Sequence, residues 1–484
     1  MASSMKMSTG IKPTRIASGL GDLVVTRQGS RAATSTRASQ AFSQGCLKSS
    51  AHSAVPNSWR RRYGGGSGSL SQCSKRQRAV DTTTTTTTTN YEGVPTVTDL
   101  SGLGAVENQV GMTYRSLDAL PTRKEVLAAI PAHCFKKNTA KSLLYAFTST
   151  ALTAACGVLG YLFIPLQAAY WPAWVAYAIV TGTVATGAWV VAHECGHGAF
   201  SDNRKLQDAV GYALHSALLV PYFSWQRSHA IHHANTNHLE EGETHVPAVA
   251  GDPKGDAGLI AKSKIGELPW TVLNSIIVLL FGWPAYLIAG ASGGPVRGAT
   301  NHFWPWAGEQ GRHSLFPGGW KKKVLMSDVG CFAVIGLLAY WAYAAGSIMP
   351  VLALYVGPYL VTNAWLVGYT WLQHTDVDIA QYTGSDWNWV RGAFLTVDRP
   401  YGPVFDFLHH RIGSTHVAHH VDHTIPHYNA VEATEALKKA FPHLYMYDPT
   451  PVHQALFRVA SKCIAVKPSG KGGQYVFTDQ PLAA

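Results

Sequence analysis

Residues 228–238 read Ser-His-Ala-Ile-His-His-Ala-Asn-Thr-Asn-His, and the rest of the chain is interpreted around this stretch. On a helix, the offsets of His229, His232 and His233 place three imidazoles on one face. Such an arrangement is typical of a shared metal rather than of a packed core, because a core rarely needs three neighbouring imidazoles. The stretch therefore predicts a metal site.

Two further clusters support this interpretation. The offsets recur at His416, His419 and His420, and upstream His193 and His197 form a pair one helical turn apart. The alternative, unrelated polar histidines on the surface, does not account for the same spacing appearing twice beside apolar runs.

Composition places the chain among membrane proteins. Of its 484 residues, 46% are hydrophobic and only 14% are charged. The net charge of +11 is local, since residues 1–80 contain 13 Lys and Arg side chains against one acid, Asp22. The remainder is close to neutral, so no basic face for nucleic acid is expected. The seven cysteines are scattered and lack a Cys-x-x-Cys pair, which excludes a disulfide framework.

The chain divides into four parts. Residues 1–80 are rich in Ser, Arg, Ala and Gly and predict a transit peptide, with a disordered basic tail as the alternative. Residues 81–120, which include a run of eight threonines, predict a low-complexity linker and pre-domain segment. Residues 121–450 predict the membrane domain, and residues 451–484 a C-terminal tail.

Two apolar stretches precede the first cluster. Residues 143–166 and 168–192 are each long enough to cross a bilayer, for which about 20 residues are needed. Two crossings return the chain to its starting side, so we expect His193 to emerge in a loop at the membrane surface. Residues 206–222 are shorter and contain Pro221, which predicts one interfacial or buried helix.

Three apolar candidates, residues 270–288, 329–345 and 351–372, separate the second cluster from the third. A shared site requires an even number of crossings. We expect residues 270–288 not to span, because Pro284 breaks them and the lysines at 321–323 should stay on the positive side. The prediction is an all-α polytopic membrane protein with about four transmembrane helices and a cytosolic or stromal helical cap that carries the histidines.

The number of histidines suggests two metal ions. Imidazole binds Fe, Cu, Zn and Ni, so the residue type does not name the metal. Eight or nine nitrogens exceed what one ion takes, and two adjacent redox-active ions suit O2 chemistry. A histidine-rich di-iron site fits better than a carboxylate di-iron bundle, because the apolar spans lack the Glu-x-x-His pattern of that class.

Two other metal proteins are alternatives. His193-Glu194-x-x-His197 matches the zinc-protease motif, in which Glu serves as the general base. That interpretation leaves six clustered histidines unexplained, and Gly196 is a poor helix residue. A polytopic metal transporter would place its ligands at mid-membrane inside the spans, whereas here they are expected in loops at the ends of spans.

The order of the three clusters resembles the three histidine boxes of the membrane fatty-acid desaturases. The boxes here are His-Glu-Cys-Gly-His at 193–197, Trp-Gln-Arg-Ser-His-x-x-His-His at 225–233 and His-Val-Ala-His-His at 416–420. The resemblance runs from about Pro121 to Pro449. It also covers Ile130-Pro131-Ala132-His133-Cys134-Phe135, Leu219-Val220-Pro221-Tyr222 and Thr396-Val397-Asp398-Arg399.

The resemblance implies a set of iron ligands. His374, which follows the last span, resembles an extra ligand that some members add, although on sequence alone it could equally be an interfacial side chain. The implied ligands to two iron ions are His193, His197, His229, His232, His233, His374, His416, His419 and His420. Five more histidines remain without an assigned role: His238, His409, His410, His423 and His427.

The resemblance also implies a reaction. Two electrons would reduce the di-iron centre, O2 would bind, and two hydrogens would leave adjacent carbons of an acyl chain esterified in a glycerolipid. A long apolar tunnel would select those carbons, because an alkyl chain offers no polar handle. The sequence has no His-Pro-Gly-Gly haem motif. The most similar stretch, Phe-Pro-Gly-Gly at 316–319, has Phe316 in the position of the haem-binding His. A separate donor is therefore expected, ferredoxin in a plastid or cytochrome b5 in the endoplasmic reticulum.

Regioselectivity is predicted from a few residues. Glu194 and residues 130–135 resemble the Δ12 (omega-6) oleate desaturases, whereas Gly198 resembles the omega-3 enzymes. Together with a plastid leader, Gly198 favours an omega-3 linoleate desaturase of the plastid envelope acting on C18 and C16 chains. The alternatives are a Δ12 desaturase of the endoplasmic reticulum or plastid, a di-iron lipid or carotenoid hydroxylase, and a metal transporter.

Overall fold

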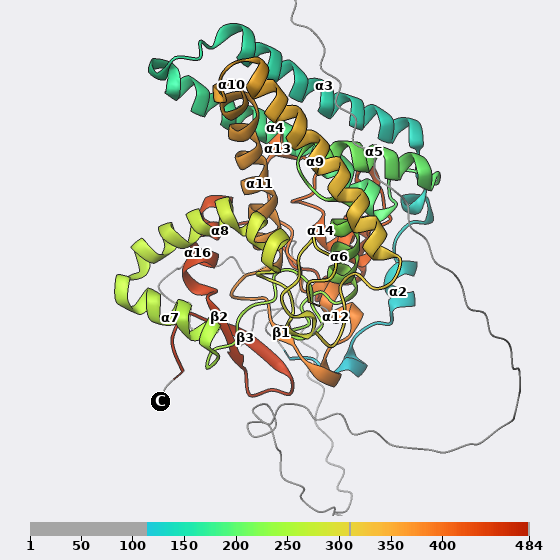
Figure 1. Ribbon diagram of the computed structural model, residues 1–484. Coiled ribbons are helices and arrows are strands. Elements are labelled where there is room, and N and C mark those ends of the chain that lie inside the picture. The colour runs from blue at the N-terminus through green and yellow to red at the C-terminus, as the bar shows by residue number, and fades with distance from the viewer. Residues whose placement is uncertain (1–113, 309–310, 483–484) are drawn as a thin grey trace, which may run out of the picture. The chain divides into compact units, whose positions relative to one another are not determined.

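The computed structural model describes residues 114–308 and 311–482, and within them the chain is mostly helical (Figure 1). The predicted transit peptide and most of the predicted linker lie outside the described residues. The helices are α2 (Arg123–Ala128), α3 (Thr139–Phe163), α4 (Trp171–His197), α5 (Arg204–Ala217), α6 (Tyr222–Ala234), α7 (Pro253–Ile265), α8 (Glu267–Ala289), α9 (Trp320–Ala344), α10 (Met349–Val351), α11 (Gly357–His374), α12 (Trp389–Phe394), α13 (Pro403–Leu408), α14 (His416–Val421), α15 (His427–Ala440) and α16 (Val452–Lys462).

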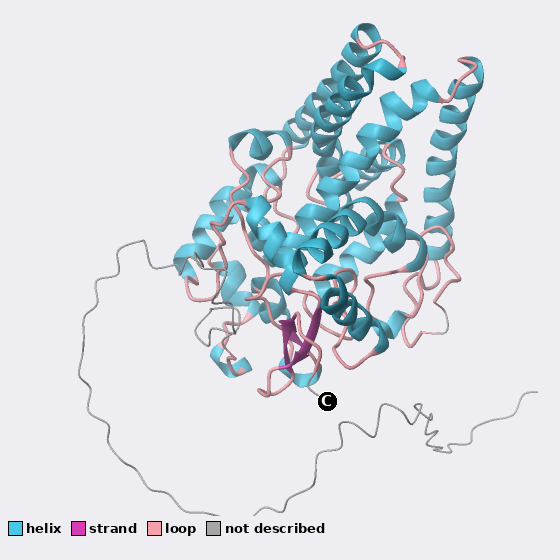
Figure 2. Cartoon of the chain, turned by 90° about the vertical axis from the view of Figure 1, so that its left-hand side faces the viewer, coloured by secondary structure: helices cyan, strands magenta, loops and turns pink. Residues whose placement is uncertain are grey.

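Four long helices, α3, α4, α9 and α11, run alongside one another (Figures 1 and 2). Small residues let α4 and α11 approach closely, as is common between helices in lipid. A Cβ atom on Gly182 would lie 2.5 Å from the Pro358 carbonyl oxygen, and the Thr362 hydroxyl donates to the Gly182 carbonyl at 3.0 Å. The outer helix α3 exposes large apolar side chains such as Phe147, as expected of a surface that faces lipid.

The long apolar helix α8 differs from its prediction. It is continuous through Pro284, although a break was expected there, and it is one of five described helices long and apolar enough to cross a membrane. Figure 1 shows it crossing near the lower end of α11 rather than running beside it. His232 precedes α8 and α9, and its Nε2 atom lies 3.1 Å from that of His374 at the end of α11. Only an even number of crossings allows this contact, so one of α8, α9 and α11 does not cross. From the direction of α8 we infer that it is the helix that lies along the membrane surface.

The ends of the helices around the first cluster also correct the sequence analysis. Helix α4 continues to His197, so the first cluster lies in the last turn of a helix and not in a loop; Gly198, with φ of +77°, then ends the helix. Residues 206–222 do not form a single helix. Helix α5 ends at Ala217, Leu219 takes a φ of +53°, and α6 begins after Pro221.

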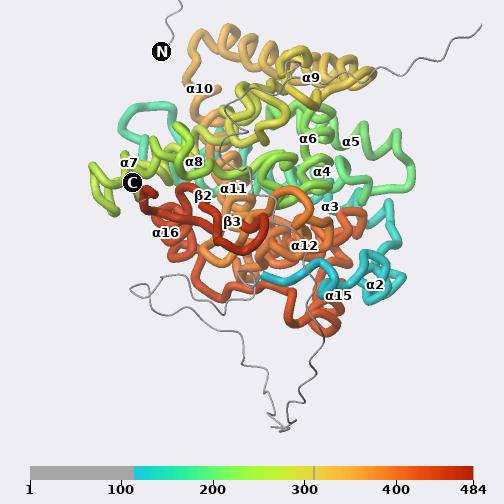
Figure 3. The backbone as a smooth tube through the Cα atoms, turned by 90° about the horizontal axis from the view of Figure 1, so that it is seen from below, coloured from blue at the N-terminus to red at the C-terminus, as the bar shows by residue number. Residues whose placement is uncertain are grey.

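A small sheet was not predicted. Strands β1 (Gln381–Tyr382), β3 (Gln474–Thr478) and β2 (Ala465–Pro468) lie in that order and are antiparallel, with Gln381 opposite Tyr475 and Ala465 opposite Thr478. Figure 2 shows the sheet at the end of the molecule away from the long helices. The predicted C-terminal tail thus forms α16, β2 and β3, and Figure 3 shows them beside α8 and α11.

Candidate metal centre

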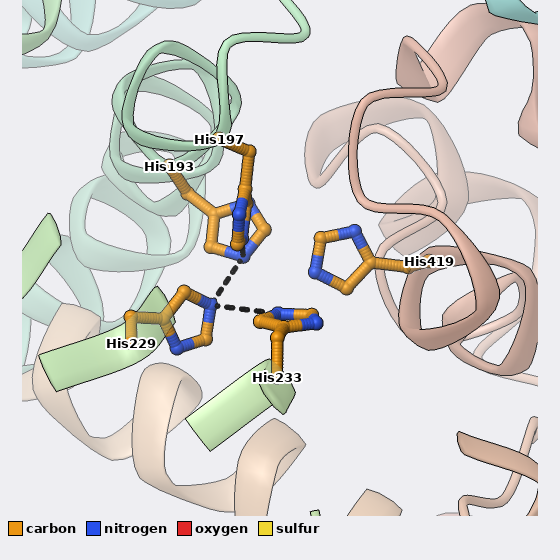
Figure 4. Close-up of side chains that lie close together, drawn as sticks. All are labelled: His193, His197, His229, His233 and His419. Carbon is orange, nitrogen blue, oxygen red and sulfur yellow. Dashed lines mark hydrogen bonds between the residues drawn. The ribbon is translucent and has the colours of Figure 1, made fainter. Parts of the chain in front are cut away.

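The nine histidines expected to bind metal lie together in two adjacent buried groups. In the first group, one ring nitrogen of each histidine lies within 4.8 Å of the others. Figure 4 shows these imidazoles converging from α4, α6 and α14. The group consists of His193, His197, His229, His233 and His419.

The second group combines α6, α11 and α14. Ring nitrogens of His232, His374 and His420 lie within 4.8 Å of one another. The Nε2 atom of His416 lies 3.0 Å from that of His374. Each of the last two boxes therefore contributes to both groups, so the three histidines of α6 do not share one site as their common face suggested.

The first and second boxes are held together by a glycine contact. A Cβ atom on Gly196 would lie 2.4 Å from the ring of Trp225, which is closer than non-bonded carbon atoms approach one another. The Gln226 side chain donates to the Gly196 carbonyl at 3.2 Å. The residue that looked unfavourable for a helix is therefore what allows α4 and α6 to bring their histidines into contact.

A buried carboxylate fixes the third box. Asp398 Oδ1 accepts the backbone N–H of Val417 at 2.9 Å, at the start of α14, and its Oδ2 accepts the Tyr445 hydroxyl at 2.6 Å. Burial raises the pKa of Asp398 to about 6, against the lowering effect of these hydrogen bonds. Asp398 belongs to one of the motifs that carried the family resemblance, but its role was not predicted.

A short strained segment orients His232. The Nδ1–H group of His232 donates to the Glu243 carbonyl oxygen at 2.9 Å. This acceptor fixes the proton of the imidazole on Nδ1, so Nε2 keeps its lone pair and faces His374. Thr244 and His245 follow with φ of +60° and +53°, a conformation that is costly for residues other than glycine. The segment is held by the buried Glu243 side chain.

The Glu243 carboxylate has two partners on other elements. It accepts the Tyr286 hydroxyl of α8 at 3.1 Å, and the Arg297 guanidinium lies 3.8 Å away. Burial raises the pKa of Glu243 to about 7, although Arg297 opposes the shift. Through Tyr286 and Glu243, α8 is thus connected to the orientation of a histidine in the second group.

Two further polar contacts lie behind the clusters. The Thr236 hydroxyl donates to the His232 carbonyl at 2.8 Å, so it accepts from His420 Nδ1 at 3.1 Å. Glu194 accepts the backbone N–H of His427 at 2.9 Å and lies 3.5 Å from His193 Nδ1. Its carboxylate is therefore behind the first group rather than beside a shared metal position, which argues against the zinc-protease alternative.

The donor set fits metal ions. Burial holds the pKa of His229, His233, His419 and His420 well below the usual value for histidine and lowers that of His232 to about 4. These imidazoles are therefore neutral at physiological pH and keep a lone pair for a metal. Nε2 of His419 and of His420 is buried without a hydrogen-bond partner among the described residues, an unfavourable state that coordination would relieve.

Three of the unassigned histidines have structural roles. His409 uses both ring nitrogens, because Nε2–H donates to the Thr183 carbonyl at 2.7 Å and Nδ1 accepts the Tyr369 hydroxyl at 2.8 Å. His410 Nε2 lies 2.9 Å from the Ser149 hydroxyl oxygen. His238 Nδ1 accepts two backbone N–H groups of the following turn.

The other two lie beside the first group. The ring centroid of His423 is 4.7 Å from that of His197, and His427 Nδ1 is 3.6 Å from Glu194. Neither belongs to the groups of converging nitrogens.

Three residues near the clusters were not predicted from the sequence. His245 stacks on His374, with ring centroids 5.7 Å apart, and His215 lies against Trp225 at 4.9 Å. Each is a lone histidine without a repeated offset, so only the fold identifies it. Asp376, which follows α11, was not singled out either; it is buried and paired with Arg458 at 2.6 Å.

An apolar cavity of about 300 Å³ adjoins both groups. It lies between α8 and α11 and contacts His229 of the first group and His232 of the second. Its walls are mostly hydrophobic and include Trp189, Val278, Trp283, Leu366, Val367 and Trp371. Such a cavity suits a chain without polar groups.

Comparison with known proteins agrees with this geometry. The family model described as fatty acid desaturase matches residues 169–450. The chain belongs to the fatty-acid desaturase family. It is therefore an oxidoreductase, and it has the membrane character of that family, with long apolar helices and a histidine-lined centre that could hold metal.

Individual relatives of this desaturase refine the comparison. It is 40% identical to a Delta(12)-acyl-lipid-desaturase of Punica granatum, over 74% of this chain and 89% of the relative. It is 40% identical to an endoplasmic-reticulum omega-6 fatty acid desaturase of Brassica juncea, over 72% and 88%. It is 39% identical to an oleoyl-12-hydroxylase of Ricinus communis, over 74% and 89%. These names favour the Δ12 alternative and give no support to the omega-3 preference or the plastid location expected from the sequence.

Proposed function

We propose that this protein is a di-iron Δ12 (omega-6) acyl-lipid desaturase that converts oleoyl chains of membrane glycerolipids to linoleoyl chains. The observation that carries the proposal is the contact between one apolar cavity and histidines of both groups. A saturated stretch of an acyl chain could lie in that cavity with adjacent carbons facing both metal positions. The Δ12 position comes from the names of the relatives.

Two iron ions would be held by the two histidine groups, with five imidazoles in the first and four in the second, including His374. When bound, they supply O2 activation and the oxidising power that removes hydrogen from an unactivated alkyl chain. Within the second group, the Glu243 carbonyl keeps the proton of His232 on Nδ1. The ring thereby offers Nε2 to the metal.

The protein itself would position the acyl chain in the cavity and exclude water from it. Trp189, Trp283 and Trp371 surround the cavity with large apolar surfaces. An alkyl chain cannot be oriented by hydrogen bonds, so regioselectivity follows from which carbons the walls allow to reach the histidines. The kinked monounsaturated chain would be recognised by shape alone.

We propose the endoplasmic reticulum as the location and cytochrome b5 as the electron donor. The location follows the printed name of the Brassica juncea relative. A donor that can reach the centre from the cytosolic side fits the inferred topology, in which α8 lies along the surface and the histidines lie at the helix ends. Ferredoxin in a plastid is the alternative that the basic leader favours.

A second function, hydroxylation of the oleoyl chain, has a specific observation in its favour. The hydroxylase of Ricinus communis is 39% identical, within the range of 36–40% of the desaturases. A hydroxylase would use the same metal groups and the same cavity while delivering oxygen to the carbon. The positions of the histidines therefore do not separate the two reactions, and the product does.

The test is the fatty-acid profile of yeast that expresses the full chain and is fed oleate or, separately, linoleate. We expect 18:2 with a new double bond at carbon 12 from oleate, dependent on O2. New 18:3 from linoleate alone would support the omega-3 reading instead. A 12-hydroxy acid as the main product would make the protein a hydroxylase.

A further inference from the structure

The C-terminal segment 451–482 forms part of the cavity wall. The family model matches only up to residue 450, so nothing in that match assigns this segment a role. Nevertheless, Cys463, Ile464 and Phe477 line the same cavity as His229 and His232. The same cavity thus contacts both metal groups and the C-terminal segment.

The segment is bonded to α8, the first wall of the cavity. The Ala460 carbonyl near the end of α16 accepts the Trp270 indole N–H at 3.2 Å and the Asn274 amide at 3.1 Å. The Lys262 ammonium group, which is buried, lies 2.7 Å from an Asp479 carboxylate oxygen. These contacts fix the last turn of α16 and the residue after β3 against α7 and α8.

The second wall, α11, is tied to the segment by buried charges. The Arg458 guanidinium of α16 lies 2.6 Å from Asp376, which follows the last turn of α11, and 2.6 Å from Asp448. Arg399 pairs with the same two carboxylates. Removing one member of such a network leaves a charge buried without its partner, so the network holds α16 firmly in place.

A third connection reaches the loop that follows His245. The backbone N–H of Val466 in β2 donates to the Ala248 carbonyl at 2.8 Å, and that of Ala250 donates to the Val466 carbonyl at 2.8 Å. Val246 and Pro247, immediately before this pairing, also line the cavity. Figure 3 shows α16, β2 and β3 next to α8 and α11.

We propose that Cys463 and Phe477 determine which length of acyl chain this enzyme accepts. The inference rests on the proposed function, since it requires that the cavity holds an acyl chain. Phe477 is a large ring packed against the apolar cluster of Trp371 and Leu372, whereas Cys463 contributes a small side chain to the same cluster. Because the three connections hold the segment in place, changes in these two side chains change the space open to the chain.

The experiment compares two lining variants and one control in yeast that expresses the full chain and is fed equal amounts of 16:1 and 18:1. Phe477→Ala enlarges the cavity and should raise the ratio of C18 to C16 products by several-fold to about tenfold. Cys463→Phe narrows it and should lower the ratio. Phe457→Ala is the matched control, since Phe457 lies on α16, is 37% exposed and does not line the cavity; its ratio should equal that of the wild type.

The amount of each variant protein in membranes is measured, and Phe477→Leu replaces Phe477→Ala if the latter does not accumulate. An unchanged ratio in both lining variants, or an equal change in the control, would overturn the inference. The proposed function fails separately, if the wild type makes hydroxylated chains. The same ratio measured on those hydroxylated products would still decide whether Cys463 and Phe477 select chain length.

Discussion

The Nε2 atoms of His232 and His374 lie 3.1 Å apart, although 142 residues separate them in the chain. The contact joins the end of α6 to the end of α11 and completes the second histidine group with His416 and His420. It is also the observation that requires an even number of membrane crossings between these two residues.

Replacement of His374 tests the second group. We expect His374→Gln to reduce product formation by at least about a hundredfold, as loss of a ligand to a reactive metal removes a large part of the catalytic effect. The control is His443→Gln, because His443 is exposed and belongs to neither group. The measurement is the amount of desaturated product per amount of protein in membranes; wild-type activity in His374→Gln would exclude it as a ligand.

Gly196 and Gly157 form a matched pair of helix glycines. Gly196→Ala should destabilise the protein by about 1–3 kcal/mol and lower activity, because the added methyl group overlaps the Trp225 ring. Gly157→Ala, in α3, has no atom within 4 Å of the added methyl group and should leave activity unchanged. Thermal unfolding in detergent and product yield check both. Equal behaviour of the two variants would show that the contact between α4 and α6 is not needed.

The ion pair between Arg297 and Glu243 predicts a compensating double substitution. Arg297→Met removes the positive charge that opposes the raised pKa of Glu243, so at pH 8 the buried carboxyl must either stay charged or take up a proton, which should cost about 1–3 kcal/mol. Adding Glu243→Gln removes the buried charge, so the double variant should be more stable than Arg297→Met alone. Melting temperatures of the two single variants and the double variant measure the coupling. Strictly additive effects would contradict a direct pair.

A half-buried acid, Asp378, predicts a dependence of stability on pH. Burial, with Asp376 nearby, raises the pKa of Asp378 to about 7 from a usual value near 4. Between these values the folded protein binds the proton and the unfolded chain does not, so this residue's contribution to stability falls as pH rises from 4 to 7. Asp378→Asn should therefore raise the melting temperature more at pH 8 than at pH 4.5. A variant that is stabilised equally at both pH values would disprove the assignment.

Much of the site could be predicted from the sequence, because metal ligation demands particular side chains at particular spacings. The nine histidines and four of the long apolar helices follow from such local patterns. Their division into two groups does not, since it depends on how α6, α11 and α14 meet. Asp376, Glu243 and His245 were not predicted for the same reason, because their partners are distant in the chain.

Local signals also misled the sequence analysis at specific points. Pro284 suggested a break, but α8 continues through it. Gly196 seemed unsuited to a helix, but its close contact with Trp225 leaves no room for a side chain at this position. The strands near the C-terminus are short, and their pairing with residues 381–382 could not be inferred from their own composition.

The most direct test of the account is the metal content of the purified full chain, measured by elemental analysis together with its protein concentration. The two histidine groups predict two metal ions per chain, and the proposed desaturation requires that both are iron, with little zinc or copper. One iron per chain, or zinc in both groups, would contradict a di-iron centre and with it the proposed desaturation of oleoyl chains.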